Sequence, residues 1–251
     1  MAIGGTRKQR DTSGDGQMGV ESWTLGDIET SRGHLIPMVD MAILLANRGA
    51  RVSFISTPVN AAHAAAAVGA RAGVSIDFVE LSFPCTAVGL PDGCENLDLL
   101  PSLESHHVEL FFSAAALLRD PLKQYLLAQP PSPGCMIADA CNPWTRFIAG
   151  ELRMPRLLFY GPSCLYTLCA RMIKHHIIWD RYKDDPFEPF DVPGLPRPLR
   201  ISMARMPWLL TAPGWEGFLE EIVESEATTD GVVINSFDDL ERVYAGAQGS
   251  G

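Results

Sequence analysis

Short apolar runs with β-strand character alternate along this chain with segments of helical periodicity. Strands are predicted at residues 51–56, 74–81, 135–138, 157–160 and 231–236. Helices are predicted at residues 36–47, 60–70, 103–127, 144–152, 164–179 and 215–226, the third of them breakable at Asp120-Pro121. Alternation of short apolar strands with helices is typical of a parallel sheet covered on both faces. We therefore predict an α/β fold with a doubly wound parallel sheet.

The composition and net charge limit the kinds of molecule that this chain is expected to bind. The 251 residues are 47 % hydrophobic, which is ample for a buried core, and their net charge of −10 argues against a nucleic-acid surface and an anionic membrane. A small-molecule partner fits better. No signal peptide and no uninterrupted apolar stretch of membrane-spanning length is visible, so we expect a cytoplasmic protein without a membrane partner. The oligomeric state is not predicted.

Cysteine and histidine patterns do not predict a metal site. The six cysteines show no CxxC pair and sit mostly in apolar segments, so free buried thiols are expected. Two histidine pairs, at 106–107 and 175–176, are adjacent in predicted helices, where neighbouring side chains point about 100° apart and cannot share a metal without further ligands.

A candidate general base stands at the start of the first predicted helix. His34 follows Gly33 there, and Asp139 follows the strand at 135–138. These two residues are 105 positions apart, and they meet only if both lie at the edge where the carboxyl ends of parallel strands gather. A helix N-terminus disfavours the imidazolium form, and an aspartate would orient a neutral ring that accepts a proton. The alternatives are a histidine that satisfies a helix end and an aspartate that caps the next helix.

Five blocks of the sequence resemble the N-terminal half of plant family 1 UDP-dependent glycosyltransferases. They are GHLIPMVDMA at 33–42, FISTPVN at 54–60, GLPDGCEN at 89–96, ADACNPWT at 138–145 and GVVINSF at 231–237. The resemblance covers nearly all of the span from 33 to 241. It implies the GT-B architecture, in which two Rossmann-like domains face each other, with the acceptor site in the first and most UDP-sugar contacts in the second.

The resemblance also assigns roles to single residues. His34 matches the catalytic base that deprotonates an acceptor hydroxyl, and Asp139 matches its charge-stabilising partner. It implies transfer with inversion from a UDP-sugar, most commonly UDP-glucose, without an obligatory metal or other cofactor. The residues expected to line the acceptor site are Gly33, Leu90, Phe111, Trp144 and Ser163. Gly33 and Ser163 could equally serve a turn and a helix cap, and the three apolar residues could equally pack in the core.

Two departures from the family pattern lead to further expectations. Residues 1–32 are polar, so we expect them to be mostly disordered or atypical and the sheet to lack a regular first strand, although Trp23-Thr24-Leu25 could imitate a short one. The acceptor domain is expected at 33–241, with a flexible tail at 242–251.

The family's donor signature is absent from the sequence, so we expect a truncated glycosyltransferase that binds the UDP-sugar weakly or not at all. Two functions stay open: transfer of a sugar to a small apolar or phenolic acceptor such as a flavonoid or terpenoid of plant secondary metabolism, and a non-catalytic acceptor-binding or interaction domain. A Rossmann oxidoreductase is disfavoured because no GxGxxG follows a predicted strand.

Overall fold

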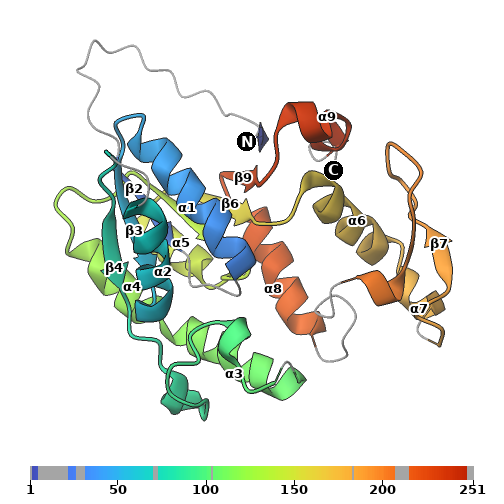
Figure 1. Cartoon of the computed structure of the whole chain (residues 1–251), viewed down its shortest axis with the longest axis horizontal. Helices are drawn as coiled ribbons and strands as arrows, with labels where there is room; N and C mark the ends of the chain where they lie inside the picture. Colours follow the sequence, from blue (N-terminus) through green and yellow to red (C-terminus); the bar gives the residue numbers. More distant parts are fainter. Residues whose placement is uncertain are drawn as a thin grey trace.

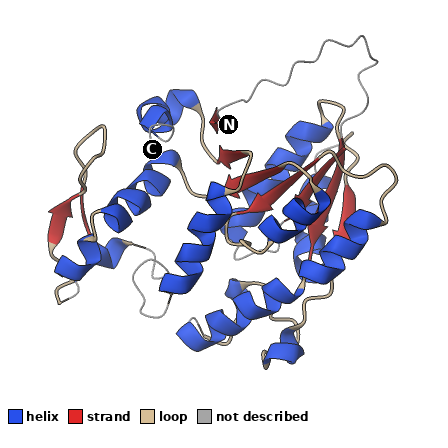
Figure 2. Cartoon of the chain, turned by 180° about the vertical axis from the view of Figure 1, so that it is seen from behind, coloured by secondary structure: helices blue, strands red, loops and turns tan. Residues whose placement is uncertain are grey.

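A computed structural model describes residues 2–4, 22–26, 32–69, 73–102, 104–182, 184–206 and 215–247. Within this part of the chain the main sheet has seven strands in the order β1-β9-β6-β5-β2-β3-β4, and a separate hairpin pairs β7 with β8. Six strands of the main sheet run parallel, and β1 pairs antiparallel with β9 at the edge. The predicted doubly wound α/β fold is confirmed (Figures 1 and 2).

The predicted strands and helices are present in the predicted order, and β1, β2, β7, β8 and α9 are additional to them. The strands are β1 (Ala2–Gly4), β2 (Ser22–Gly26), β3 (Arg51–Ser56), β4 (Asp77–Glu80), β5 (Cys135–Asp139), β6 (Arg156–Tyr160), β7 (Pro189–Asp191), β8 (Arg200–Ser202) and β9 (Gly231–Ile234). The α-helices are α1 (Arg32–Ala46), α2 (Pro58–Gly69), α3 (Ser105–Leu117), α4 (Arg119–Leu127), α5 (Thr145–Leu152), α6 (Cys164–His175), α7 (Ile178–Tyr182), α8 (Glu216–Ala227) and α9 (Asp238–Ala247). The break predicted at Asp120-Pro121 falls two residues earlier, at Leu118 between α3 and α4.

The expectation that the sheet lacks a regular first strand is wrong. Ser22–Gly26 forms β2 in the middle of the sheet, where Leu25 is in register with Phe54 of β3 and Ile137 of β5. Leu25 is fully buried and Thr24 nearly so. The strand forms from a sequence with few apolar residues because strands on both sides supply its backbone hydrogen bonds, whatever its side chains are.

The N-terminal segment expected to be mostly disordered therefore contains two strands, since β1 also falls within it. Residues 5–21 and 27–31 lie outside the described part of the chain. The tail expected from residue 242 is helical as far as Ala247, because α9 continues to that residue.

The sheet separates two apolar layers. Alternate residues of its strands enter opposite layers: Phe54 faces one layer and Ile55 the other, and Phe159 and Leu158 divide in the same way. Helices α1 and α2 cover the first layer, while α3, α4, α5 and α8 cover the second (Figure 1). Burial on both faces explains why these strands read as continuous apolar runs.

A third, smaller apolar cluster lies beside the sheet. It joins α6 and α7 to the β7–β8 hairpin through Ile173, Ile178 and Phe190 (Figure 2). No helix within the described residues combines the length and the apolar character that crossing a bilayer requires.

A carboxylate ties α9 to the start of α6. Glu241 departs from helical geometry (φ −136°, ψ 28°), and its carboxylate accepts hydrogen bonds from the backbone N–H groups of Cys164 (2.8 Å) and Leu165 (3.1 Å) and from the Ser236 hydroxyl. Burial alone would raise the pKa of Glu241, but the hydrogen bonds that its carboxylate accepts outweigh burial, and the pKa is lowered. Glu241 thus acts as a helix cap supplied from a distant part of the sequence.

Replacing Glu241 by alanine is expected to lower the free energy of unfolding by about 1 kcal/mol at neutral pH, the usual effect of losing a helix cap. Because the pKa is lowered in the folded state, the stabilisation is present above the ordinary pKa of 4.5 and disappears as the pH falls through the folded value. Urea unfolding across this pH range checks both points. Asp239→Ala, an exposed position on the same helix, is the control, and an E241A loss that stays constant down to acid pH would contradict the assignment.

Candidate active site

His34 and Asp139 form a hydrogen-bonded pair at the carboxyl edge of the sheet. His34 lies in the first turn of α1, and Asp139 is the last residue of β5. The His34 Nδ1 and Asp139 Oδ2 atoms are 2.6 Å apart. The His34 side chain is 20 % exposed and that of Asp139 is 0 % exposed, so the aspartate holds the ring from inside the protein while the imidazole still reaches the surface.

This hydrogen bond selects one form of the imidazole. An ionised carboxylate can only accept, so Nδ1 of His34 carries the hydrogen and Nε2 becomes the basic nitrogen of the neutral ring. The carboxylate is itself held in place, because its Oδ1 atom accepts the backbone N–H of Cys141 at 2.7 Å. The pair therefore has the arrangement of a general base with an orienting partner.

Two residues that the sequence analysis did not assign to the site lie against this pair. A Cβ atom placed on Gly161 would come within 3.1 Å of the His34 ring, so the glycine backbone approaches the imidazole closely. Cys141 contributes a thiol to the same place. Gly161 carries no local sequence signal, because it reaches His34 only after β5 and β6 pair, whereas Cys141 stands two residues after Asp139 in the sequence.

The donor atoms of His34, Asp139 and Cys141 all lie within 4.8 Å of one another. A nitrogen, an oxygen and a sulfur are ligands that Zn²⁺ accepts. The hydrogen bond between His34 and Asp139, however, already engages one donor atom of each. The geometry describes a proton-transfer pair better than a preformed metal site.

The residues predicted to line an acceptor site fall into two groups. Gly33 is exposed in the first turn of α1, and Ser163 caps α6, where its hydroxyl accepts the backbone N–H of Tyr166 at 3.3 Å. Leu90, Phe111 and Trp144 come together, but as buried members of the apolar layer under α3 and α5. Their present contacts are those of core packing.

A cavity of about 510 Å³ lies away from the His34–Asp139 pair. Its lining includes Arg153, Arg156 and Asp230. Arg156 begins β6 and Asp230 precedes β9, so this cavity is at the amino edge of the parallel sheet, opposite to the edge that carries Asp139. It is therefore separate from the candidate active site.

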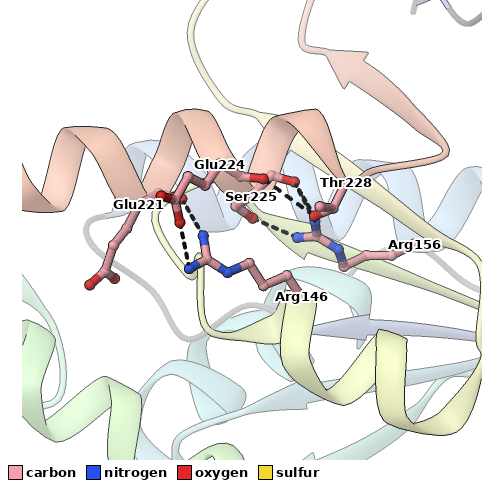
Figure 3. Close-up of polar contacts among 6 residues, drawn as sticks. All are labelled: Arg146, Arg156, Glu221, Glu224, Ser225 and Thr228. Atoms are coloured by element: carbon pink, nitrogen blue, oxygen red, sulfur yellow. Dashed lines mark hydrogen bonds and ion pairs between the residues drawn. The ribbon is translucent and has the colours of Figure 1, made fainter.

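Helix α8 is fixed to the sheet by the buried Arg156 and to α5 by the half-buried Arg146 (Figure 3). The Arg156 guanidinium, on a residue only 1 % exposed, donates to the Ser225 hydroxyl (2.8 Å), the Ser225 carbonyl and the Thr228 hydroxyl (3.2 Å). Arg146 reaches the same helix through the Glu221 carbonyl and the Glu224 carboxylate. Burial, with a smaller effect of nearby Arg146, lowers the pKa of Arg156 to about 10, which leaves it charged at neutral pH.

Tyr160, the last residue of β6, connects this helix to the site edge. Its hydroxyl donates to Glu226 of α8 at 2.9 Å, and Glu226 also binds Arg171 of α6. Burial, followed by the neighbouring Glu226 carboxylate, raises the pKa of Tyr160 well above its ordinary value. The tyrosine is therefore a neutral hydrogen-bond donor that joins three elements.

The parallel sheet with His34 and Asp139 at its carboxyl edge matches the N-terminal, Rossmann-like domain of the GT-B fold. The chain is 36 % identical to UDP-glycosyltransferase 73C1 of Arabidopsis thaliana over 217 residues, which is 85 % of this chain and 44 % of that protein. It is 37 % identical to UDP-glycosyltransferase 73C6 of the same plant over 219 residues, with 86 % and 44 % covered. The chain is thus a homologue of the N-terminal half of plant UDP-glycosyltransferases.

Solved structures agree with this relationship. Glycyrrhiza uralensis UGT73P12, complexed with glycyrrhetinic acid 3-O-monoglucuronide, superposes with a TM-score of 0.74 at 29 % identity, covering 90 % of this chain and 46 % of that one. Arabidopsis thaliana UGT89C1, complexed with UDP-L-rhamnose, gives 0.61 at 22 % identity and supports the fold alone. No protein-family model matches the sequence. The chain spans less than half the length of the curated relatives it matches.

Proposed function

We propose that this chain supplies the acceptor side and the catalytic base of a UDP-sugar-dependent glycosyltransferase. The observation that supports the proposal is the 2.6 Å contact between His34 and a fully buried Asp139 at the carboxyl edge of the sheet, where ligands of doubly wound folds bind. The similarity to plant UDP-glycosyltransferases supports the reaction class, and UDP-glucose is the donor we propose.

In the proposed reaction, Nε2 of His34 takes the proton of an acceptor hydroxyl. The acceptor oxygen forms a bond to the anomeric carbon as the bond from that carbon to the β-phosphate oxygen breaks, so the configuration inverts and UDP leaves with the electron pair. Asp139 stabilises the imidazolium that forms, as the carboxylate of a catalytic triad does. General base catalysis of this kind is commonly worth about 10²–10⁴-fold in rate. The proposal requires neither a metal nor another cofactor.

We propose a small apolar or phenolic acceptor such as a flavonoid or terpenoid. Gly33 would let it approach the backbone, Ser163 would lie near the transferred sugar, and Leu90, Phe111 and Trp144 would form the apolar wall.

A non-catalytic acceptor-binding or interaction domain is the second candidate that we propose. UDP-sugar binding to this chain alone would then be weak or absent. We propose a cytoplasmic location for either candidate.

A turnover assay and calorimetry separate the two candidates. Purified chain is given UDP-glucose and a panel of phenolic acceptors, and UDP release is measured against His34→Ala. Release that depends on His34 supports transfer by this chain, whereas equal release by the variant rules it out. Heat of binding with an acceptor but not with UDP-glucose would favour the non-catalytic binding domain. No heat of binding with either compound would contradict both proposals.

A further inference from the structure

We infer that Gly161 and Asn235 are positioning residues for His34: together they form a rigid backbone wall that fixes the orientation of the imidazole ring. The inference rests on the function proposed above for its consequence in catalysis. The geometry behind it comes from three contacts around the His34 ring and the loop between β6 and α6.

The first contact concerns the space that Gly161 leaves. A Cβ atom at this position would lie 3.1 Å from Cγ, 3.2 Å from Cδ2 and 3.3 Å from Nδ1 of His34, all closer than ordinary van der Waals contact. The φ angle of Gly161 is not in the positive range that favours glycine, so other residues could adopt its backbone conformation. The glycine therefore serves the close approach of the ring and not the shape of the turn.

The second contact fixes the wall itself. The Asn235 side chain, just after β9, donates from Nδ2 to the Gly161 carbonyl at 3.1 Å, and its backbone N–H donates to the Tyr160 carbonyl at 3.0 Å. These two bonds attach the peptide groups on both sides of Gly161, Tyr160–Gly161 and Gly161–Pro162, to the end of β9. A loop residue thereby gains the rigidity of the sheet.

The third contact closes the arrangement. Asp139, held by the Cys141 N–H, fixes the Nδ1 end of the ring by hydrogen bonding, and the Gly161 backbone limits how the ring can turn about that bond. With both constraints in place, Nε2 points in one direction. Catalysis depends on such placement, since a misplacement of about 1 Å can cost about 10²-fold in rate.

Adding one methyl group at position 161 is expected to slow catalysis. In Gly161→Ala the imidazole must shift by a few tenths of an ångström, which weakens its alignment with Asp139, and the turnover number is expected to fall about tenfold with the KM for acceptor nearly unchanged. Asn235→Ala removes the bond to the Gly161 carbonyl without adding bulk, while the backbone N–H of residue 235 still donates to Tyr160, so a smaller loss in the turnover number is expected.

Gly231→Ala is the matched control. Its added Cβ would also lie 3.1 Å from a neighbour, but that neighbour is the end of the Leu157 side chain, remote from the dyad. It should therefore reproduce any general cost of crowding while leaving His34 unaffected.

The decisive measurement is NMR of the full chain with ¹⁵N-labelled histidine, because it needs no turnover. In the wild type the Nδ1 atom of His34 should carry the proton and Nε2 should not. Gly161→Ala should shift these nitrogen resonances or mix the tautomers, and Gly231→Ala should leave them in place. Unchanged His34 resonances in a folded Gly161→Ala chain, with thermal melting confirming the fold, would overturn the inference. A chain that shows the NMR effect but no UDP release would refute the proposed function and leave the positioning role intact.

Discussion

Replacing Asp139 by asparagine is expected to reduce glycosyl transfer by about 10²–10⁴-fold while leaving the fold unchanged. The side chain keeps its size in a site that is fully buried, but an amide offers one donor group and one acceptor oxygen in place of two acceptor oxygens. If the amide nitrogen faces His34, Nδ1 must accept, and the proton moves to Nε2, the nitrogen that should act as the base. If the oxygen faces His34, the nitrogen confronts the Cys141 N–H, which loses its acceptor.

Initial rates of UDP release at saturating and limiting acceptor separate the two kinetic effects. We expect most of the loss in kcat, because the interaction strengthens only as the imidazolium forms. Asp77→Asn, at an exposed position of β4, supplies the control with the same chemical change. A rate for Asp139→Asn within threefold of the wild type would remove Asp139 from the mechanism.

The fold could be predicted from the sequence wherever a strand carries its own apolar run. The strands β3, β5, β6 and β9 are buried on both faces and read as such. β2 could not be recognised, because only Trp23 and Leu25 mark it and its stability comes from pairing with β3 and β5. The same reason hid β1, whose three residues form a strand only against β9.

Some residues of the candidate site could be predicted from the sequence and others could not. His34 and Asp139 could be predicted because each stands at a recognisable helix start or strand end, and the doubly wound topology brings those points to one edge. Gly161 and Asn235 could not, since a glycine beside a proline is a common turn residue and Asn235 fell near the end of the predicted strand at 231–236, where an asparagine has no special meaning. Their relation to His34 depends on β5, β6 and β9 lying side by side.

The burial of Arg156 could not be predicted from the residues next to it in the sequence. An arginine before an apolar run suggests a solvated strand end, and the predicted strand began one residue later. In the structure β6 begins at Arg156 and buries it, because acceptors from α5 and from α8 and its C-terminal turn converge on the guanidinium. Such a set of partners, up to 72 residues away in sequence, has no local signature.

Replacing Arg156 by alanine is expected to lower the free energy of unfolding by about 3–5 kcal/mol, the range found when one partner of a buried ionic or hydrogen-bonded group is removed. The change leaves the Ser225 hydroxyl and carbonyl and the Thr145 hydroxyl without their donor, and it opens a void where the side chain lay. It also removes the positive charge at the C-terminal end of α8, where the helix dipole favours a cation.

Urea unfolding measures this loss of stability. Two further variants serve as a control for an exposed arginine and as a test of the charge. Arg242→Ala, 78 % exposed and 3.8 Å from an exposed Asp239, should cost less than about 0.5 kcal/mol. Arg156→Lys keeps the charge but cannot spread donors over three acceptors in the plane of a guanidinium, so it should recover only a minor part of the stability. Full recovery of stability by lysine would show that the charge alone matters. A loss below about 1 kcal/mol for alanine would contradict the role of Arg156 and would show that α8 is held by its apolar contacts with α3.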